Sequence, residues 1–241
     1  MATASHTRTS AARRRARPAL AFALGALAWS SSAVATAYVT QVPSGRDDLA
    51  LFALVGEITG GETLELTRLV SQLPSNRAVT VILHSPGGNL TEGLALGRFF
   101  HKARISTLLL GDGGRCASAC ATAFLGGRDR QGRPSRTKMR SSQLGFHQFF
   151  ARLTGDTTKL RFSKEQMEQR VVQTHGQVLE LIAYLSDIGE ELDKLDLMLA
   201  VPGTALRYVT NEEAATYGIN VVNERDNTVI EASNVRARSD R

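Results

Sequence analysis

A serine lies between two cysteines in the segment GGRCASACATAF, Gly113 to Phe124. Cys116 and Cys120 are the only cysteines of this 241-residue chain, and Ser118 is midway between them. These residue types allow three interpretations: a serine nucleophile, a reactive thiol, or small residues packed at the start of a buried helix. The segment alone does not decide among them, so the surrounding sequence has to.

Ser118 is a useful nucleophile only with a base for its proton and donors for the oxyanion that forms. A glycine-rich loop that runs into a helix leaves backbone N–H groups free, and the helix dipole favours negative charge there. The N–H of Ala119 is therefore one predicted donor. Gly88, in SPGG, is the second, because a residue without a side chain lets the backbone approach closely.

Five histidines are candidates for the base. His6 belongs to a segment that we expect to be removed, and His101 and His175 lie in predicted helices remote from the strand ends. His84 directly precedes SPGG. His147 lies in the apolar segment LGFHQFF, where an isolated histidine is usually a hydrogen-bonded core residue.

The chain alternates predicted strands and helices, which predicts right-handed crossovers and a mainly parallel sheet. Strands are predicted at 49–58, 78–85 and 105–111, and helices at 60–73, 90–103, from about 118, and at 163–188. In such sheets a site lies at the carboxyl ends of the strands, where HSPGG and GDGGRCAS fall. The basic segment 128–140 predicts an exposed loop or hairpin.

The N-terminus has the features of a secretory signal peptide. Five arginines in the first 17 residues precede the apolar run 19–29 and the small residues Ala35 and Ala37. We expect a signal peptide at 1–37, or an uncleaved anchor, then a linker at 38–48, one domain at 49–223 and a polar tail at 224–241. Cleavage removes five of the 29 basic residues and leaves 24 against 23 acidic ones, so the formal charge of +6 falls to about +1. Nothing in that balance requires nucleic acid.

Four motifs occur in a fixed order: SPGGNLTEGLALGRFF, STLLLGDGGRCASAC, LGFHQ and, after a long predicted helix, YVTNEEAATYGI. Their order resembles the ClpP/crotonase superfamily, specifically ClpP, and most closely a branch of exported ClpP-like proteins with SAC and GFH motifs. The resemblance runs from about Leu51 to Val222. It implies a ClpP/crotonase-like α/β fold of repeated β-β-α or β-α units, with a mainly parallel sheet and a long handle-like helix.

The resemblance also implies residue roles. It makes Ser118 the nucleophile and His147 the general base, with the amides of Gly88 and Ala119 as the oxyanion hole. The helix at 163–188 matches the handle region by which ClpP subunits form rings, so we expect a homo-oligomer.

The sequence departs from ClpP at the third member of the catalytic triad. ClpP has an Asp shortly before the segment matched by YVTNEEAATYG, whereas this chain has Leu206 at or near that position. Asp193, Asp196 and Thr204 are unranked substitutes. Without an orienting carboxylate, His147 can take a proton but is poorly held in the right tautomer.

The two cysteines leave a choice open. On a regular helix their Cβ atoms would be about 5–6 Å apart, whereas a disulfide needs about 3.5–4.5 Å, so a bridge requires a distorted first turn. Export permits a Cys116–Cys120 disulfide, which would fix the loop that presents Ser118. Two buried free thiols are the alternative, and a nucleophilic cysteine is the least favoured.

The leading hypothesis is an exported, periplasmic or extracytoplasmic serine peptidase that acts on peptides or unfolded proteins. Its compartment lacks ATP, so we expect no ATP-driven unfoldase, and membrane contact only through an uncleaved N-terminal segment. One alternative is a weakened or inactive ClpP-like fold that serves as a binding or assembly protein. Another is a crotonase-type acyl-CoA enzyme, which usually needs a catalytic carboxylate and a cytosolic cofactor. We find no metal-ligand spacing and no phosphate-binding fingerprint, and expect neither metal nor cofactor.

Overall fold

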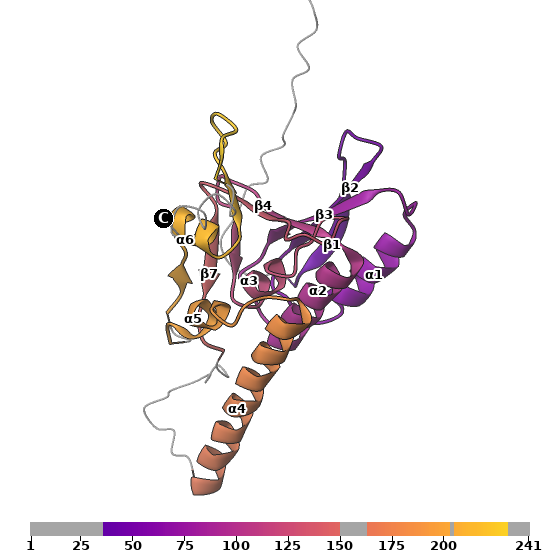
Figure 1. The fold of residues 1–241 in the computed structure, drawn as a ribbon. Coiled ribbons are helices and arrows are strands. Elements are labelled where there is room, and N and C mark those ends of the chain that lie inside the picture. Colours follow the sequence, from indigo (N-terminus) through magenta and orange to yellow (C-terminus); the bar gives the residue numbers. More distant parts are fainter. Residues whose placement is uncertain (1–35, 150–162, 203–204, 231–241) are drawn as a thin grey trace, which may run out of the picture. The chain divides into compact units, whose positions relative to one another are not determined.

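The computed structural model describes residues 36–149, 163–202 and 205–230 of the chain (Figure 1). Residues 1–35 carry nearly all of the expected signal peptide, so that expectation lies outside the described residues. Within the described ranges, no helix is both long enough and apolar enough to cross a membrane.

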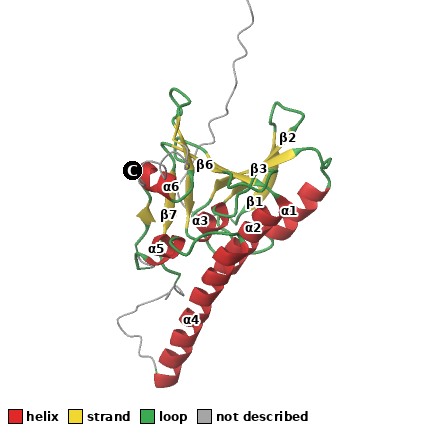
Figure 2. Ribbon diagram, viewed as in Figure 1, coloured by secondary structure: helices red, strands yellow, loops and turns green. Residues whose placement is uncertain are grey.

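A seven-stranded sheet forms the larger part of the fold (Figure 2). Its inner strands, in the order β2-β3-β4-β6-β9, are parallel, and β1 and β10 add to the two edges as antiparallel strands. The predicted α/β class with a mainly parallel sheet is therefore confirmed. The strands are β1 Tyr38–Val42, β2 Leu49–Val55, β3 Ala78–His84, β4 Ser106–Leu109, β6 Arg136–Met139, β9 Asn220–Val222 and β10 Val229–Ile230.

A second, three-stranded sheet has the order β5-β7-β8. Strand β5 (Arg115–Ala117) pairs with β7 (Gln143–Phe146) in parallel, and β7 pairs with β8 (Arg207–Tyr208) in antiparallel register. This small sheet ends at Ser118 on one strand and at His147 on the next.

Side-chain caps set the starts of the longer helices after the first. Asn89 accepts from Glu92 N at the start of α2, and Ser163 forms a capping box with Gln166 at the start of α4. The predicted helices at 90–103 and 163–188 are thus found with nearly the expected bounds. The helices are α1 Glu62–Ser71, α2 Leu90–Ala103, α3 Ala119–Phe124, α4 Lys164–Asp187, α5 Lys194–Leu199 and α6 Asn211–Thr216.

The short helix α3 lies in the centre of the core, and all six of its residues are buried. Helix α2 packs directly against it, since a Cβ on Gly93 would meet the Ala119 carbonyl oxygen at 2.6 Å. The buried Tyr184 of α4 donates from its hydroxyl to the Thr122 carbonyl at 2.7 Å. The first half of α4, by contrast, extends away from the sheets (Figure 1).

Three expectations about polar segments were wrong. Residues 38–48, expected as a linker, contain β1, and the expected tail from 224 contains β10 as far as 230, while 231–241 lie outside the described residues. The basic segment 128–140, expected as an exposed loop or hairpin, is exposed only at 130–134 and at 140, because it also contains the central strand β6.

Three basic side chains of this segment, those of Arg128, Arg136 and Lys138, are buried because their charges have partners. Glu190 contacts Arg128 at 2.8 Å and Arg136 at 3.0 Å, and all three side chains are buried. Lys138 donates to the Asn211 side-chain oxygen at 2.6 Å and to a backbone carbonyl. These partners, far along the chain, solvate the buried charges in place of the water that surrounds an exposed loop.

Candidate active site

Three chain segments run side by side and end together at Ser118. Ser85 N donates to Arg115 O at 2.8 Å, and Ala117 N donates back to Ser85 O at 3.0 Å. On the other side of β5, Ser118 N donates to Gly145 O of β7 at 2.9 Å. The glycine loop that follows β3, the end of β5 and the end of β7 are thereby brought to one place, as the sequence predicts.

Ser118 occupies a strained turn between β5 and α3. Its φ of 56° and ψ of −126° lie in a region that residues other than glycine rarely adopt, and such residues cost about 1–3 kcal/mol. The residue is 8% exposed, and its side chain makes no capping hydrogen bond to the helix. A serine presented on a sharp strand-to-helix turn is the arrangement used by nucleophile elbows.

The N–H groups of Gly88 and Ala119 donate no hydrogen bond within the described residues. At Gly88 the reason is the local pairing, because Ile58 bonds to Gly87 O and Asn89 N, so the N–H of Gly88 faces the other way. Ala119 is fully buried, and a buried N–H without an acceptor is rare. Two such donors beside one serine fit an oxyanion hole.

Gly87 brings the two donors together. A Cβ at this position would meet the Ser118 Cβ at 2.6 Å and the Ala119 N at 3.1 Å, so the loop lies directly against the start of α3. The φ of Gly87 is +100°, which also favours glycine. The loop is further held by Ser85, whose buried hydroxyl oxygen accepts from Gly87 N at 3.0 Å.

The role of Ser85 was missed at the level of sequence. Its only signal is its place in SPGG, two residues before the glycine whose N–H it binds. A serine there forms a local turn of this kind, and that pattern is common enough to carry little weight alone.

His147 lies one residue beyond β7 and is half-buried. Its Nδ1 is 2.6 Å from the carbonyl oxygen of Gln148, and its ring packs near that of Phe149 with centroids 6.1 Å apart. Among the described residues no hydrogen bond joins Ser118 Oγ to His147. The two residues directly follow the paired strands β5 and β7, and in free enzymes catalytic hydrogen bonds are often long or poorly aligned.

Leu206 directly precedes β8, the strand that pairs with β7. The β7–β8 register pairs Gly145 with Tyr208 and Phe146 with Arg207, and its continuation sets Leu206 opposite His147. Neither Asp193 nor Asp196, both exposed in or beside α5, forms a hydrogen bond or ion pair with His147 within the described part of the chain.

The third candidate substitute, Thr204, lies outside the described residues. No described carboxylate therefore orients the ring of His147.

The two cysteines form a disulfide across Ser118, with Cα atoms 5.3 Å apart. The objection from helix geometry does not apply, because Cys116 belongs to β5 and only Cys120 to α3. Both residues are fully buried. The bridge thus joins the strand before Ser118 to the helix after it, and neither sulfur is a free thiol.

Two of the other histidines have different surroundings. His84 Nδ1 lies 3.4 Å from Arg115 N, which donates to it, and burial together with the Arg115 charge lowers the pKa of His84. His175 is exposed on α4. His6, which we expect to be removed with the signal peptide, lies outside the described residues.

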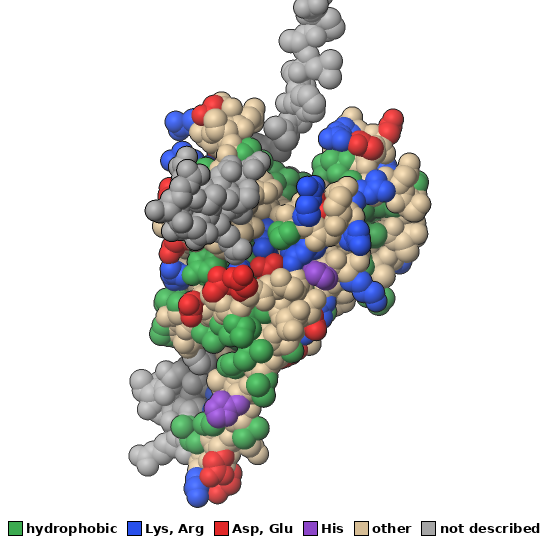
Figure 3. All heavy atoms as spheres, in the orientation of Figure 1, with side chains coloured by type: hydrophobic (Ala, Val, Ile, Leu, Met, Phe, Trp, Pro, Cys, Tyr) green, Lys and Arg blue, Asp and Glu red, His purple; other side chains and the backbone are tan. Residues whose placement is uncertain are grey.

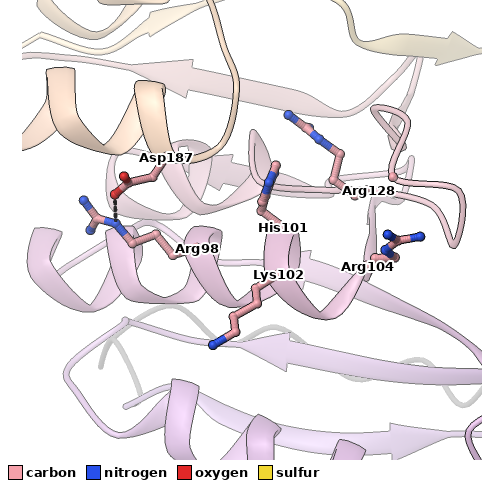
Figure 4. Close-up of a pocket in the computed structure, with 7 residues that line it drawn as sticks. Arg98, His101, Lys102, Arg104, Arg128 and Asp187 are labelled. Atoms are coloured by element: carbon pink, nitrogen blue, oxygen red, sulfur yellow. Dashed lines mark hydrogen bonds and ion pairs between the residues drawn. The ribbon is translucent and has the colours of Figure 1, made fainter.

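A basic hollow of about 480 Å³ lies at the far end of α2 from the Gly87 loop (Figure 4). Arg98, on one side, pairs with Asp187 at 2.7 Å, and Arg128, on the other, binds backbone carbonyls and Glu190, with His101 between them. Because these guanidinium groups are already engaged at helix ends, the hollow belongs to the ion-pair network rather than to the site at Ser118.

No protein-family model matches the chain, and no curated protein matches it at a significant level. Within the described residues, no group of three or more His, Cys, Asp or Glu side chains could hold a metal ion.

Proposed function

We propose that the chain is an exported ClpP-like serine hydrolase that cleaves peptides. The observation that supports this most strongly is Ser118 in a strained strand-to-helix turn, beside the unengaged N–H groups of Gly88 and Ala119. The position of His147 at the end of the adjacent strand adds to it. The resemblance of the ordered motifs supplies the substrate class.

The proposed chemistry is acyl transfer. Ser118 Oγ attacks the carbonyl carbon of the peptide, and its proton passes to Nε2 of His147, while the Gly88 and Ala119 N–H groups stabilise the oxyanion. The C–N bond then breaks, and the amine leaves with the proton from Nε2. Water attacks the resulting ester, gives its proton to Nε2, and releases the carboxylic acid as Ser118 regains its hydroxyl hydrogen.

The ClpP/crotonase-like form of the fold is part of the proposal. It is supported by the parallel sheet, by the small second sheet that ends at Ser118, and by the long helix α4 that follows the histidine. Other α/β folds have these features as well, so the ordered sequence motifs are what favours the ClpP/crotonase-like form over them.

Turnover of fluorogenic peptides by the purified protein tests the proposal. Ser118→Ala and His147→Ala should each lower kcat by a factor on the order of 10³ or more. The matched controls are Ser71→Ala, at the exposed end of α1, and His175→Ala, on the exposed face of α4. Full turnover by Ser118→Ala protein would overturn the proposal.

Self-assembly through α4 is also proposed. Hydrophobic side chains gather along the part of the surface formed by α4 (Figure 3). Met167, Val171, Val172 and Leu179 are 50–70% exposed, and their spacings of four and seven residues put them along one side of the helix. Val172→Glu with Leu179→Glu should convert the oligomer to monomer in light scattering, and an unchanged mass would contradict this.

Partners follow from the proposed export. A compartment without ATP supplies no unfoldase, so the substrates are short or already unfolded chains. Co-purification with an ATPase from intact cells would contradict this part of the proposal.

One observation favours a second candidate, a ClpP-like fold that binds or assembles without efficient catalysis. His147 contacts no carboxylate among the described residues, and a neutral partner stabilises the imidazolium less. Peptide turnover that His147→Ala abolishes would exclude this candidate.

A further inference from the structure

We propose that Gln148 is the positioning residue for the His147 base, with its backbone carbonyl in the place where a triad has a carboxylate. This inference rests on the proposed hydrolase function. It answers the question left by Leu206, which lies opposite the histidine where an acid was expected. The group that orients the ring comes from the next residue along the chain.

The contact fixes the tautomer of the ring. His147 Nδ1 lies 2.6 Å from Gln148 O, and a carbonyl oxygen only accepts hydrogen bonds. Nδ1 therefore carries the hydrogen and donates it, which leaves the lone pair of a neutral imidazole on Nε2. This is the tautomer that a general base needs in order to take a proton from a serine.

The residue that bears this carbonyl is itself held by two hydrogen bonds. Gln148 N donates to Val201 O at 2.9 Å, and Gln148 Nε2 donates to Leu199 O at 2.7 Å. Leu199 ends α5, and that helix is anchored by Leu197 and Met198, which are fully buried. Main chain and side chain thus attach Gln148 to a fixed element at the edge of the core.

The end of α5 and the segment that follows it bind Gln148. The resemblance to ClpP places a triad Asp shortly before YVTNEEAATYG, whereas here Leu199 and Val201 supply carbonyls that hold Gln148. A carbonyl dipole stabilises the imidazolium less than a full negative charge, so the tautomer is preserved and the rate is lower than in a complete triad.

The variant that tests this is Gln148→Glu. It keeps the shape of the side chain, but an ionised carboxylate cannot donate to Leu199 O. The matched control is Gln143→Glu, an exposed position at the start of β7 whose side chain makes no hydrogen bond to a described residue. Both variants add one negative charge to the chain, so Gln143→Glu controls for the change in net charge, and the hydrogen bond to Leu199 O is lost only in Gln148→Glu.

Two readouts are measured on the full chain. The first is the tautomer of the His147 ring from long-range ¹H–¹⁵N spectra of histidine-labelled protein, assigned with a His147→Asn variant. The second is kcat and KM for a peptide ester. Wild type and Gln143→Glu should show the Nδ1–H tautomer, and Gln148→Glu a mixture, with kcat reduced roughly fivefold and KM unchanged.

The outcomes separate this inference from the function on which it rests. An Nε2–H tautomer in the wild type, or unchanged tautomer and kcat in Gln148→Glu, overturns the role of Gln148 even if Ser118-dependent turnover is strong. An Nδ1–H tautomer without any turnover instead contradicts the hydrolase and leaves the Gln148 contact in place. The wild-type spectrum decides the matter even if Gln148→Glu fails to fold.

Discussion

Removing the disulfide between Cys116 and Cys120 should lower the free energy of unfolding by about 2 kcal/mol. The bridge spans a sequence separation of four, so it closes a loop of five residues. For a loop of this size the chain-entropy relation gives about 7 cal/mol/K, or about 2 kcal/mol at 25 °C. This is similar to the roughly 1–3 kcal/mol that the positive φ of Ser118 costs.

The comparison of these two energies predicts a functional effect. If the bridge holds the strained turn, its loss lets Ser118 relax toward an ordinary conformation. An equilibrium shift of about 2 kcal/mol would reduce the population of the competent turn by up to about 30-fold. Activity should therefore fall by a factor of that order while the global fold survives.

Urea unfolding of three samples measures the effect: oxidised wild type, wild type reduced under denaturing conditions and refolded, and Cys116→Ala with Cys120→Ala. The reduced protein loses the bond alone, whereas the alanine variant also loses the packing of two buried sulfur atoms. Its unfolding free energy should therefore be the lowest of the three. Peptide turnover of the same samples gives the activity ratio.

Two results would refute this reasoning. The first is an unfolding free energy that changes by less than about 0.5 kcal/mol on reduction. The second is a loss of about 2 kcal/mol with full activity, which would mean that the bridge stabilises the fold without holding the serine.

Three further changes test other parts of the structure. Glu190→Gln removes the carboxylate shared by two buried arginines and should cost about 3–5 kcal/mol in urea unfolding; a loss under about 1 kcal/mol would contradict it. Burial alone would raise the pKa of Glu190, but the two guanidinium groups hold it below 4.5, so this stabilisation is present above that value and is lost as the pH falls through the folded-state pKa. The unfolding free energy of Glu190→Gln should accordingly fall less steeply than that of the wild type as the pH decreases into the acid range. Gly176→Ala, in open space on α4, should raise the unfolding free energy by about 1 kcal/mol, and a loss would show that the position is covered. Gly87→Ala should abolish turnover, whereas Gly113→Ala, with a similar φ but no neighbour within 4 Å, should retain it; equal effects would deny the contact with the serine.

The parts of the fold that the sequence predicts are those whose signals are local. Helix α2 has the predicted bounds and a local cap at Asn89, and α4 has a capping box at Ser163. Strand β2 is an uninterrupted apolar run, and β3 is rich in β-branched residues. Because each of these signals lies within one element, no tertiary contact was needed to find them.

The parts that the sequence did not predict depend on partners far along the chain. Arg136 and Lys138 give β6 the composition of an exposed loop, and only Glu190 and Asn211 make their burial possible. Strand β1 is a short edge strand that is held by its pairing with β2 and by Val39, which packs against the core. Neither pairing has a signature within its own segment.

The candidate site divides in the same way. The glycine loop lies against Ser118, and His147 follows the strand that pairs with the one before Ser118. The partner of His147 has no sequence signal, because every residue has a backbone carbonyl and only the conformation after β7 turns that of Gln148 toward the ring.

The central claim, that Ser118 is an activated nucleophile, is tested most directly by a fluorophosphonate probe and intact-mass spectrometry on the purified full chain. The account predicts one probe per chain, located on the peptide that contains Ser118, with labelling absent in Ser118→Ala and much slower in His147→Ala. Equal labelling of wild type and Ser118→Ala, or a wild type that the probe does not modify at all, would contradict it.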